Sequence, residues 1–201
     1  MSVRASFVAA SAGLMLSVSI PAAFAVSPPA QHFFAEGNAG RSCALAAAAS
    51  ENGAAATDRD LASCTAAIEL TRRNMANGYA EALTNRGVLH LVRSEYDDAI
   101  ADSTAALRID TNLAEARVNR GIALMHRHQL KDAIEDFTTA LRVAPAHAEI
   151  VYLNRAMARE DSGDLTGAYL DYRTAGELNP GWDRPKQELS RFTVVPKKPI
   201  S

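Results

Sequence analysis

The sequence predicts an all-α protein built as a solenoid of stacked helix hairpins, with a capping helix at its C-terminal end. The first observation is a tripeptide that returns at steps of 34 and 35 residues: Asn85-Arg86-Gly87, Asn119-Arg120-Gly121 and Asn154-Arg155-Ala156. The second is a set of alanines that keep this period downstream, namely Ala99, Ala133 and Ala168, then Ala106, Ala140 and Ala175. A fixed period of this length is typical of one supersecondary unit stacked on itself.

Each unit has two helical halves. In the first copy, Leu83, Gly87 and His90 step by four and three residues along one stripe of the segment 80–93. The segment 96–109 also places its apolar and small residues at helical spacing. Small residues recur where two helix axes must approach closely. The pattern therefore predicts two closely packed helices in every copy.

The positions of the small residues resemble those of the tetratricopeptide repeat (TPR) family. Each copy has a small residue at the eighth position and alanine at the twentieth and twenty-seventh, and Pro145 and Pro180 stand near the thirty-second position of the later copies. The resemblance covers residues 80–180 and implies antiparallel helix pairs in a right-handed superhelical solenoid whose first helices line a concave groove. The chain departs from the family pattern where Thr111 replaces the first proline and where the frequent tryptophan of the fourth position is absent.

The rest of the chain fits around these copies. We expect a signal peptide at 1–25, a flexible lead-in at 26–40, a degenerate TPR-like hairpin at 41–75, repeats at 80–113, 114–148 and 149–182, a capping helix at 183–193 and a disordered tail at 194–201. A terminal cap is expected because the last unit of a solenoid has no neighbour on one side. Trp182, Leu189 and Phe192 are the apolar residues that could cover this end.

The first 25 residues are typical of a secretory signal. Arg4 supplies a positive start, an apolar run follows, and Ala23-Phe24-Ala25 fits a small-x-small cleavage site. The alternative is an uncleaved anchor, although the run is shorter than the roughly 20 strongly apolar residues of a spanning helix. With cleavage we expect no membrane insertion of the mature chain, and an exported protein with the periplasm as first location and secretion as the alternative.

Cys43 and Cys64 are the only cysteines. In an oxidising compartment an even pair usually forms a disulfide. The segment Cys64-Thr65-Ala66-Ala67-Ile68 is similar to Ser103-Thr104-Ala105-Ala106-Leu107, which places Cys64 in the second helix of the degenerate hairpin. We expect a structural disulfide between the two cysteines. The alternative is a pair of free or redox-active thiols, although the spacing is not that of a CxxC motif.

The groove implied by the resemblance is the best candidate binding site. Its predicted residues are three asparagines, each followed one turn later by an apolar residue: Asn85 and Val88, Asn119 and Ile122, Asn154 and Met157. An amide side chain offers a donor and an acceptor, so a ladder of amides could pair with the backbone of an extended peptide. The alternative is that the asparagines bond locally within the repeat. A clamp for a carboxylate terminus is not supported, because Thr84, Val118 and Leu153 stand where its first lysine would be.

The arginines next to these asparagines have a periodic counter-charge. Arg86, Arg120 and Arg155 recur in phase with Asp102, Asp136 and Asp171. We therefore expect structural ion pairs between the two helices of each repeat, with ligand-binding arginines as the alternative.

The remaining patterns argue against other functions. A net charge of −2 with a pI near 6.2 does not indicate nucleic-acid binding. His126 and His128 lie at a predicted bend without a recognisable zinc spacing, so we predict no metal site. No nucleophile elbow or phosphate loop is present, and we predict no catalytic residue and no cofactor.

Together these observations predict a non-enzymatic binding protein. Its function would be to hold a protein or peptide partner in the concave groove, in a bacterial cell envelope. The alternative is a scaffold that assembles through its convex face or its ends. An enzyme or redox protein that uses Cys43 and Cys64 is the third possibility.

Overall fold

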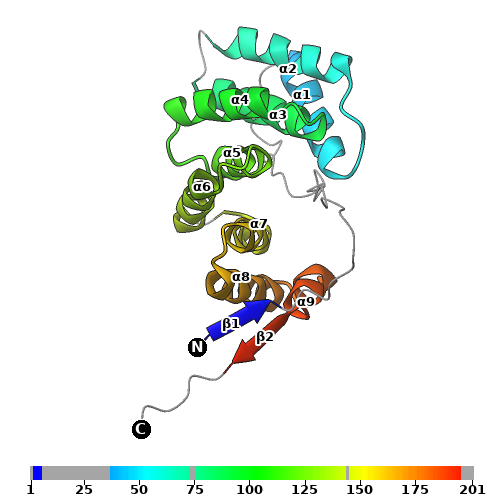
Figure 1. Cartoon of the computed structure of the whole chain (residues 1–201). Helices are drawn as coiled ribbons and strands as arrows, with labels where there is room; N and C mark the ends of the chain where they lie inside the picture. The colour runs from blue at the N-terminus through cyan, green and yellow to red at the C-terminus, as the bar shows by residue number, and fades with distance from the viewer. Residues whose placement is uncertain (1, 6–36, 73–75, 144, 196–201) are drawn as a thin grey trace. The chain divides into compact units, whose positions relative to one another are not determined.

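The computed structural model describes residues 2–5, 37–72, 76–143 and 145–195 (Figure 1). Most of the expected signal segment and lead-in, and residues 196–201 of the expected tail, lie outside the described residues. The elements form two compact units. One contains the helices up to residue 145, and the other contains the elements from residue 146 onward together with a strand from the N-terminus. Each unit is described separately.

The described residues of the larger unit form three helix hairpins. They are α1 (Gly37–Glu51) with α2 (Asp58–Thr71), α3 (Ala76–Val92) with α4 (Tyr96–Ile109), and α5 (Ala114–His126) with α6 (Leu130–Arg142). Within the unit α3 contacts both α1 and α5, and α2 and α4 each pack against the first helix of the next hairpin (Figure 1). This is the helical-hairpin solenoid that the repeat predicts. The first helix begins at Gly37, so the expected lead-in is shorter than 26–40.

The small residues lie between packed helices, as the period predicts. Gly87 and Gly121 are on the first helices of their hairpins, and a Cβ atom at Gly121 would lie 2.7 Å from the Phe137 ring on α6. A Cβ at Gly87 would lie 3.4 Å from Ser103 Oγ on α4, which is an ordinary contact. Of these two glycines, only Gly121 is restricted to glycine by its neighbour.

The turns within the hairpins share one backbone conformation. Ser94, His128 and Gly163 follow the first helices of the three repeats at positive φ, with values of 60°, 57° and 88°. In each turn, the residue that follows the positive-φ residue donates its backbone N–H to the carbonyl of the residue five positions earlier. Glu95, for example, donates to the His90 carbonyl at 2.9 Å. This is the Schellman arrangement, in which a left-handed residue ends a helix and satisfies its free carbonyls.

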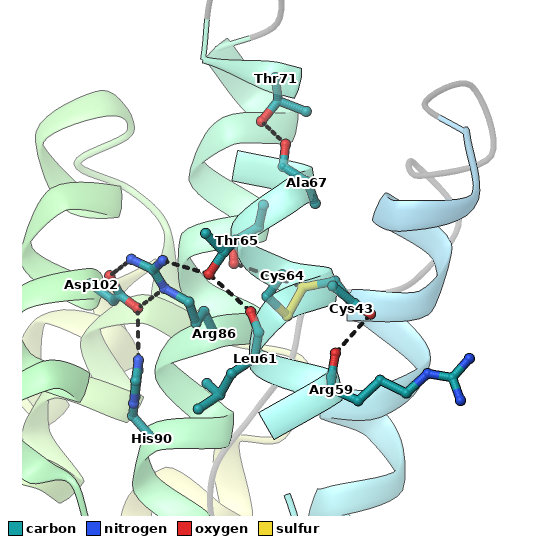
Figure 2. The surroundings of a disulfide bond; sticks show 12 residues. Cys43, Arg59, Leu61, Cys64, Thr65, Ala67, Thr71, Arg86, His90 and Asp102 are labelled. Carbon is teal, nitrogen blue, oxygen red and sulfur yellow. Dashed lines mark hydrogen bonds and ion pairs between the residues drawn. A yellow bond between two sulfur atoms is a disulfide. The ribbon is translucent and has the colours of Figure 1, made fainter. Parts of the chain in front are cut away.

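The first hairpin is held by a cap and a disulfide. Thr57 and Asp60 exchange side-chain to backbone hydrogen bonds at the start of α2, which is a capping box. Cys43 on α1 and Cys64 on α2 form a disulfide, and both are fully buried (Figure 2). The bond joins the two helices of the first hairpin among the described residues of this unit. Closing a loop of this length contributes about 3 kcal/mol in the chain-entropy model.

The smaller unit contains the third repeat and the C-terminal elements. It comprises α7 (Ala148–Asp161), α8 (Leu165–Leu178), α9 (Asp183–Leu189) and the antiparallel strands β1 (Ser2–Ala5) and β2 (Phe192–Val195). The register pairs Ser2 with Val195 and Ala5 with Phe192. Among the described ranges, no helix has both the length and the apolar character of a membrane span.

The C-terminal end differs from the prediction. The capping helix ends at Leu189, whereas the sequence suggested 193, and Phe192–Val195 form a strand where a helix end and the start of a disordered tail were expected. The Phe192 ring packs on Tyr169 and Tyr172 of α8, with centroid distances of 6.1 and 5.9 Å. Phe192 thus anchors this end to α8, as expected, but from a strand. The β-branched residues that follow it favour this conformation.

Candidate functional site on the inner helices

The predicted groove residues lie on the first helices of the hairpins. Asn85 and Val88 are on α3, and Asn119 and Ile122 are one repeat later on α5, which contacts α3. The α7 helix of the smaller unit has Asn154 and Met157 at the same positions. The spacing of three residues puts each asparagine and its apolar neighbour on one face of the helix.

These six side chains are buried, with at most 8 % of their surface exposed. The predicted ladder of amides is therefore not open to solvent. Asparagine is short, and neighbouring side chains on closely packed helices can cover it. The helical period predicts which face a residue is on, but it does not predict how deeply the neighbours bury that face.

The amide of Asn85 stands out among the buried polar groups. Its side chain is 0 % exposed, and within the described part of the chain neither its Nδ2 nor its Oδ1 has a hydrogen-bond partner. A buried polar group without a partner costs about 1–3 kcal/mol. Both a donor and an acceptor are affected here, so a group that supplied one carbonyl and one N–H would match this amide.

The arginines beside the asparagines pair with aspartates in every repeat. The Nε and Nη2 atoms of Arg86 donate to the two carboxylate oxygens of Asp102, both at 2.7 Å. Arg120 contacts Asp136 at 2.7 and 2.7 Å, and Arg155 contacts Asp171 at 2.8 and 2.8 Å. This bidentate geometry is the pairing that the shared period predicts.

These contacts engage the arginines in structure. The aspartate side chains are no more than 8 % exposed. The hydrogen bond with Asp102 raises the pKa of Arg86, and that with Asp136 raises the pKa of Arg120. An ion pair buried in this way is costly to break from one side. The arrangement therefore supports structural ion pairs more than arginines that bind a ligand.

The arginines also connect successive hairpins, which the sequence analysis missed. Arg86 on α3 donates through Nη1 to Thr65 Oγ1 on α2, at 3.1 Å (Figure 2). Arg120 on α5 donates in the same way to Thr104 Oγ1 on α4, at 3.3 Å. Each arginine thus connects the second helix of its own hairpin to the second helix of the preceding hairpin. The signal was available, because Thr65 and Thr104 have the same place in the two similar segments.

A cavity of about 350 Å³ lies among α4, α5 and α6 of the larger unit. Its lining residues are Ile100, Thr104, Arg117, Arg120, Leu124, Asp132, Glu135 and Asp136. The arginines that line it already have partners. Arg120 pairs with Asp136, and Arg117 donates to the backbone oxygen of Thr111 at 2.9 Å. The cavity offers no clear set of groups for a ligand or a reaction.

His126, at the bend of the second repeat, makes a packing contact. The ring of His126 stacks on Tyr96 of α4, with a centroid distance of 4.2 Å and an interplanar angle of 8°. Burial lowers the pKa of His126, and the nearby His128 lowers it further. His126 is therefore a packing residue on α5.

Comparison with known proteins identifies the family. No family model and no curated protein matches the chain. Among solved structures, the Sgt2 TPR domain from Aspergillus fumigatus is 30 % identical, over 55 % of this chain and 74 % of that chain, with a TM-score of 0.51. The first TPR domain of human RPAP3 is 25 % identical, over 55 % of this chain and 87 % of that chain, with a TM-score of 0.53.

A MamA RS-1 double mutant matches a larger part of the chain, 77 %, and 83 % of its own length. Its TM-score is 0.60, and at 17 % identity the similarity shows the fold alone. The chain belongs to the tetratricopeptide repeat family. Its TPR-domain neighbours support a protein–protein interaction module, with proteins or peptides as the general class of partner.

Proposed function

We propose that this protein binds an extended segment of a protein partner along α3 and α5, and that it carries out no covalent chemistry. The observation that supports this most directly is the amide of Asn85, which has no hydrogen-bond partner among the described residues. Because this amide is fully buried, the proposal requires the groups that cover it to move aside when the partner binds. A peptide backbone supplies one carbonyl and one N–H per residue, which is the pair of groups that this amide lacks.

The neighbouring residues suggest how such a partner would be recognised. Val88 lies next to Asn85 on α3, and Ile122 occupies the matching position on α5. Hydrogen bonds to the peptide backbone do not depend on the partner's sequence, so apolar contacts with these two residues would provide what selectivity there is. Thr84 and Val118 are fully buried and carry no positive charge, so capture of a terminal carboxylate is not part of the proposal.

We propose that the protein acts after export, with the periplasm as its compartment. The support is the signal-like sequence of residues 1–25, whose cleavage would also remove β1, and the disulfide between Cys43 and Cys64. Disulfides of this kind persist in oxidising compartments and are rare in the cytosol. Labelling of the native protein with a thiol reagent tests the disulfide on which this proposal depends, and we expect labelling only after unfolding and reduction. Strong labelling of the folded, unreduced protein would contradict a structural disulfide and favour a redox function.

The partner site is tested by site-specific photocrosslinking in cells. A photoreactive amino acid placed at Glu81, on the same helix as Asn85, should crosslink to a partner polypeptide that mass spectrometry identifies. The same amino acid at the exposed position Arg108 on α4 should not give that product. A synthetic peptide that spans the crosslinked segment then serves as the probe for titration against the purified chain.

The variant Asn85→Ala makes the test specific. We expect it to weaken binding of that peptide by about ten- to a hundredfold, because two hydrogen bonds are lost. The same change should raise the free energy of unfolding of the unbound protein by about 1–2 kcal/mol, since it removes a buried amide without partners. Asn112→Ala, at an exposed loop asparagine, is the control. A variant that loses stability while keeping its affinity would show that Asn85 is structural.

A scaffold that assembles through its end is the second candidate, and one observation favours it. Leu45 on α1 and Leu70 on α2 are 59 % and 61 % exposed, in the first hairpin of the larger unit. Sedimentation of the wild-type chain and of Leu70→Lys distinguishes the two functions. Self-association that the lysine abolishes would support assembly, whereas a monomer at all concentrations would leave peptide binding as the function.

A further inference from the structure

The turn between α3 and α4 brings three potential metal ligands together. His90 comes from the last turns of α3, Glu95 directly precedes α4, and Asp98 lies in the first turn of α4. One ligand atom from each residue lies within 4.8 Å of the other two. The closest pair is His90 Nδ1 and Glu95 Oε2, at 2.7 Å. We propose that these three side chains form a binding site for a divalent transition-metal ion, with Zn²⁺ as the best fit.

The donor set determines the class of ion. An imidazole nitrogen and two carboxylate oxygens suit Zn²⁺ and its neighbours, whereas Mg²⁺ and Ca²⁺ prefer oxygen ligands alone. Ligand atoms around a tetrahedral Zn²⁺ lie roughly 3.4 Å apart, so the three side chains would each move by only about 1 Å. Asp98 is exposed and can rotate freely. A fourth position would remain for water or for a ligand from a partner.

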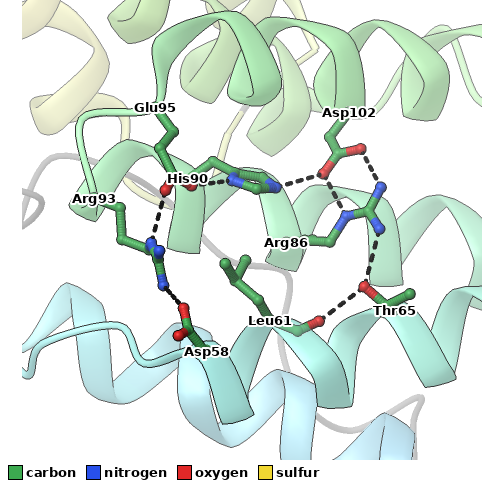
Figure 3. Close-up of polar contacts among 8 residues, drawn as sticks. All are labelled: Asp58, Leu61, Thr65, Arg86, His90, Arg93, Glu95 and Asp102. Carbon is green, nitrogen blue, oxygen red and sulfur yellow. Dashed lines mark hydrogen bonds and ion pairs between the residues drawn. The ribbon is translucent and has the colours of Figure 1, made fainter.

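The imidazole ring of His90 has a buried carboxylate near its second nitrogen, as many metal-binding histidines do. Its Nε2 lies 3.7 Å from Asp102 Oδ2, on the side opposite to Glu95 (Figure 3). Asp102 is itself fixed by the two hydrogen bonds from Arg86. Histidines that bind metals usually direct the second ring nitrogen toward a carboxylate, which fixes the tautomer and the orientation of the ring. This contact is independent of the three proposed ligands.

Arg93 is the group that competes most directly with a metal ion. Its Nε donates to Glu95 Oε1 at 2.9 Å, and another nitrogen contacts Asp58 on α2 (Figure 3). The contact leaves the other oxygen of Glu95, the one that faces His90, for the ion. Among the described residues, Arg93 is hydrogen-bonded to one of the two carboxylates, and Arg86 interacts with Asp98 without a hydrogen bond to it. The oxygen of Glu95 that faces His90 and the carboxylate of Asp98 therefore remain as candidate ligands for a divalent cation.

The ligand set is an exception within the repeat. Positions 34 residues after His90, Glu95 and Asp98 are Leu124, Gln129 and Asp132. The second hairpin forms the same turn without the histidine and the glutamate. The three residues are therefore not required to build this turn. The second repeat also provides substitutions that this fold already accommodates, namely His90→Leu and Glu95→Gln.

The test is a calorimetric titration of the full chain, disulfide intact and without an affinity tag, with ZnCl₂ in a buffer free of chelators. We expect one saturable equivalent per chain, and Co²⁺ should give the strong visible absorption of a four-coordinate site. Mg²⁺ and Ca²⁺ should not compete. His90→Leu and Glu95→Gln should each weaken Zn²⁺ binding by at least about tenfold. Circular dichroism reports whether each variant is folded.

His147→Leu is the matched control, because His147 is half exposed and faces a single carboxylate, Glu149, at 3.7 Å. We expect it to bind Zn²⁺ as the wild type does. Three results would overturn the proposal: no saturable binding to the wild type, unchanged affinity in both His90→Leu and Glu95→Gln, or loss of the site in His147→Leu.

Discussion

The hairpins α3–α4 and α5–α6 have the same backbone plan and the same arginine–aspartate pair, but they fill the space between their helices differently. In α5–α6 the Phe137 ring fills the space in front of Gly121, and Leu124 continues an apolar interface. In α3–α4 the matching positions are Ser103 and His90, and the hydroxyl of Ser103 has no hydrogen-bond partner among the described residues. The period therefore preserves the ion pair and the turn, while the packing around them varies.

The largest effects should come from the feature that the two hairpins share. Asp102→Ala and Asp136→Ala each leave a guanidinium without its counter-charge, and we expect each to lower the free energy of unfolding by about 3–5 kcal/mol. Urea unfolding measures this. The control is Asp97→Ala, which removes an exposed partner of Arg127 and should cost at most about 1 kcal/mol. Unequal losses at Asp102 and Asp136 would show that the pairs are not equivalent.

Replacing Gly121 or Gly87 by alanine should change the stability of the protein differently in the two hairpins. Gly121→Ala puts a methyl group against the fully buried Phe137 ring and should cost about 1–3 kcal/mol. Gly87→Ala has room for its Cβ and should be neutral, or should stabilise the helix by up to about 1 kcal/mol. Thermal and urea unfolding of both variants test the contrast. Adding Phe137→Leu to Gly121→Ala should recover part of the loss, and equal effects at the two glycines would refute the difference in packing.

The smallest effect concerns acid stability. The hydrogen bond with His90 lowers the pKa of Glu95, although burial acts in the opposite direction. A carboxyl group with a lowered pKa in the folded state stabilises the protein above its unfolded pKa of about 4.3, and this contribution disappears as the pH falls through the folded value. The stability difference between wild type and Glu95→Gln should therefore shrink as the pH falls below about 4.3. Gln129→Glu, which has no histidine partner, should not show this dependence.

The sequence predicted most of the features that repeat, although the repeated arginine–threonine contacts were missed. Arg120 and Asp136 recur in phase, so their pairing could be predicted, and Cys64 could be placed because its surroundings resemble those of Ser103. The burial of Asn85 could not be predicted in this way, since it depends on side chains from other helices. The pairing of Ser2–Ala5 with Phe192–Val195 joins two short segments from opposite ends of the chain, and neither carries a strong local pattern.

The contact from Arg86 to Thr65 has a consequence for how a repeat protein of this kind can gain or lose hairpins during evolution. The hairpin α3–α4 has both halves of this junction, because Arg86 reaches back to Thr65 and Thr104 receives Arg120 of the next hairpin. A duplicated α3–α4 hairpin would therefore already contain both halves of the new junction. Tandem gene duplication could extend this array without any compensating substitution at the joint, and deletion of a whole hairpin would leave a joint that still matches.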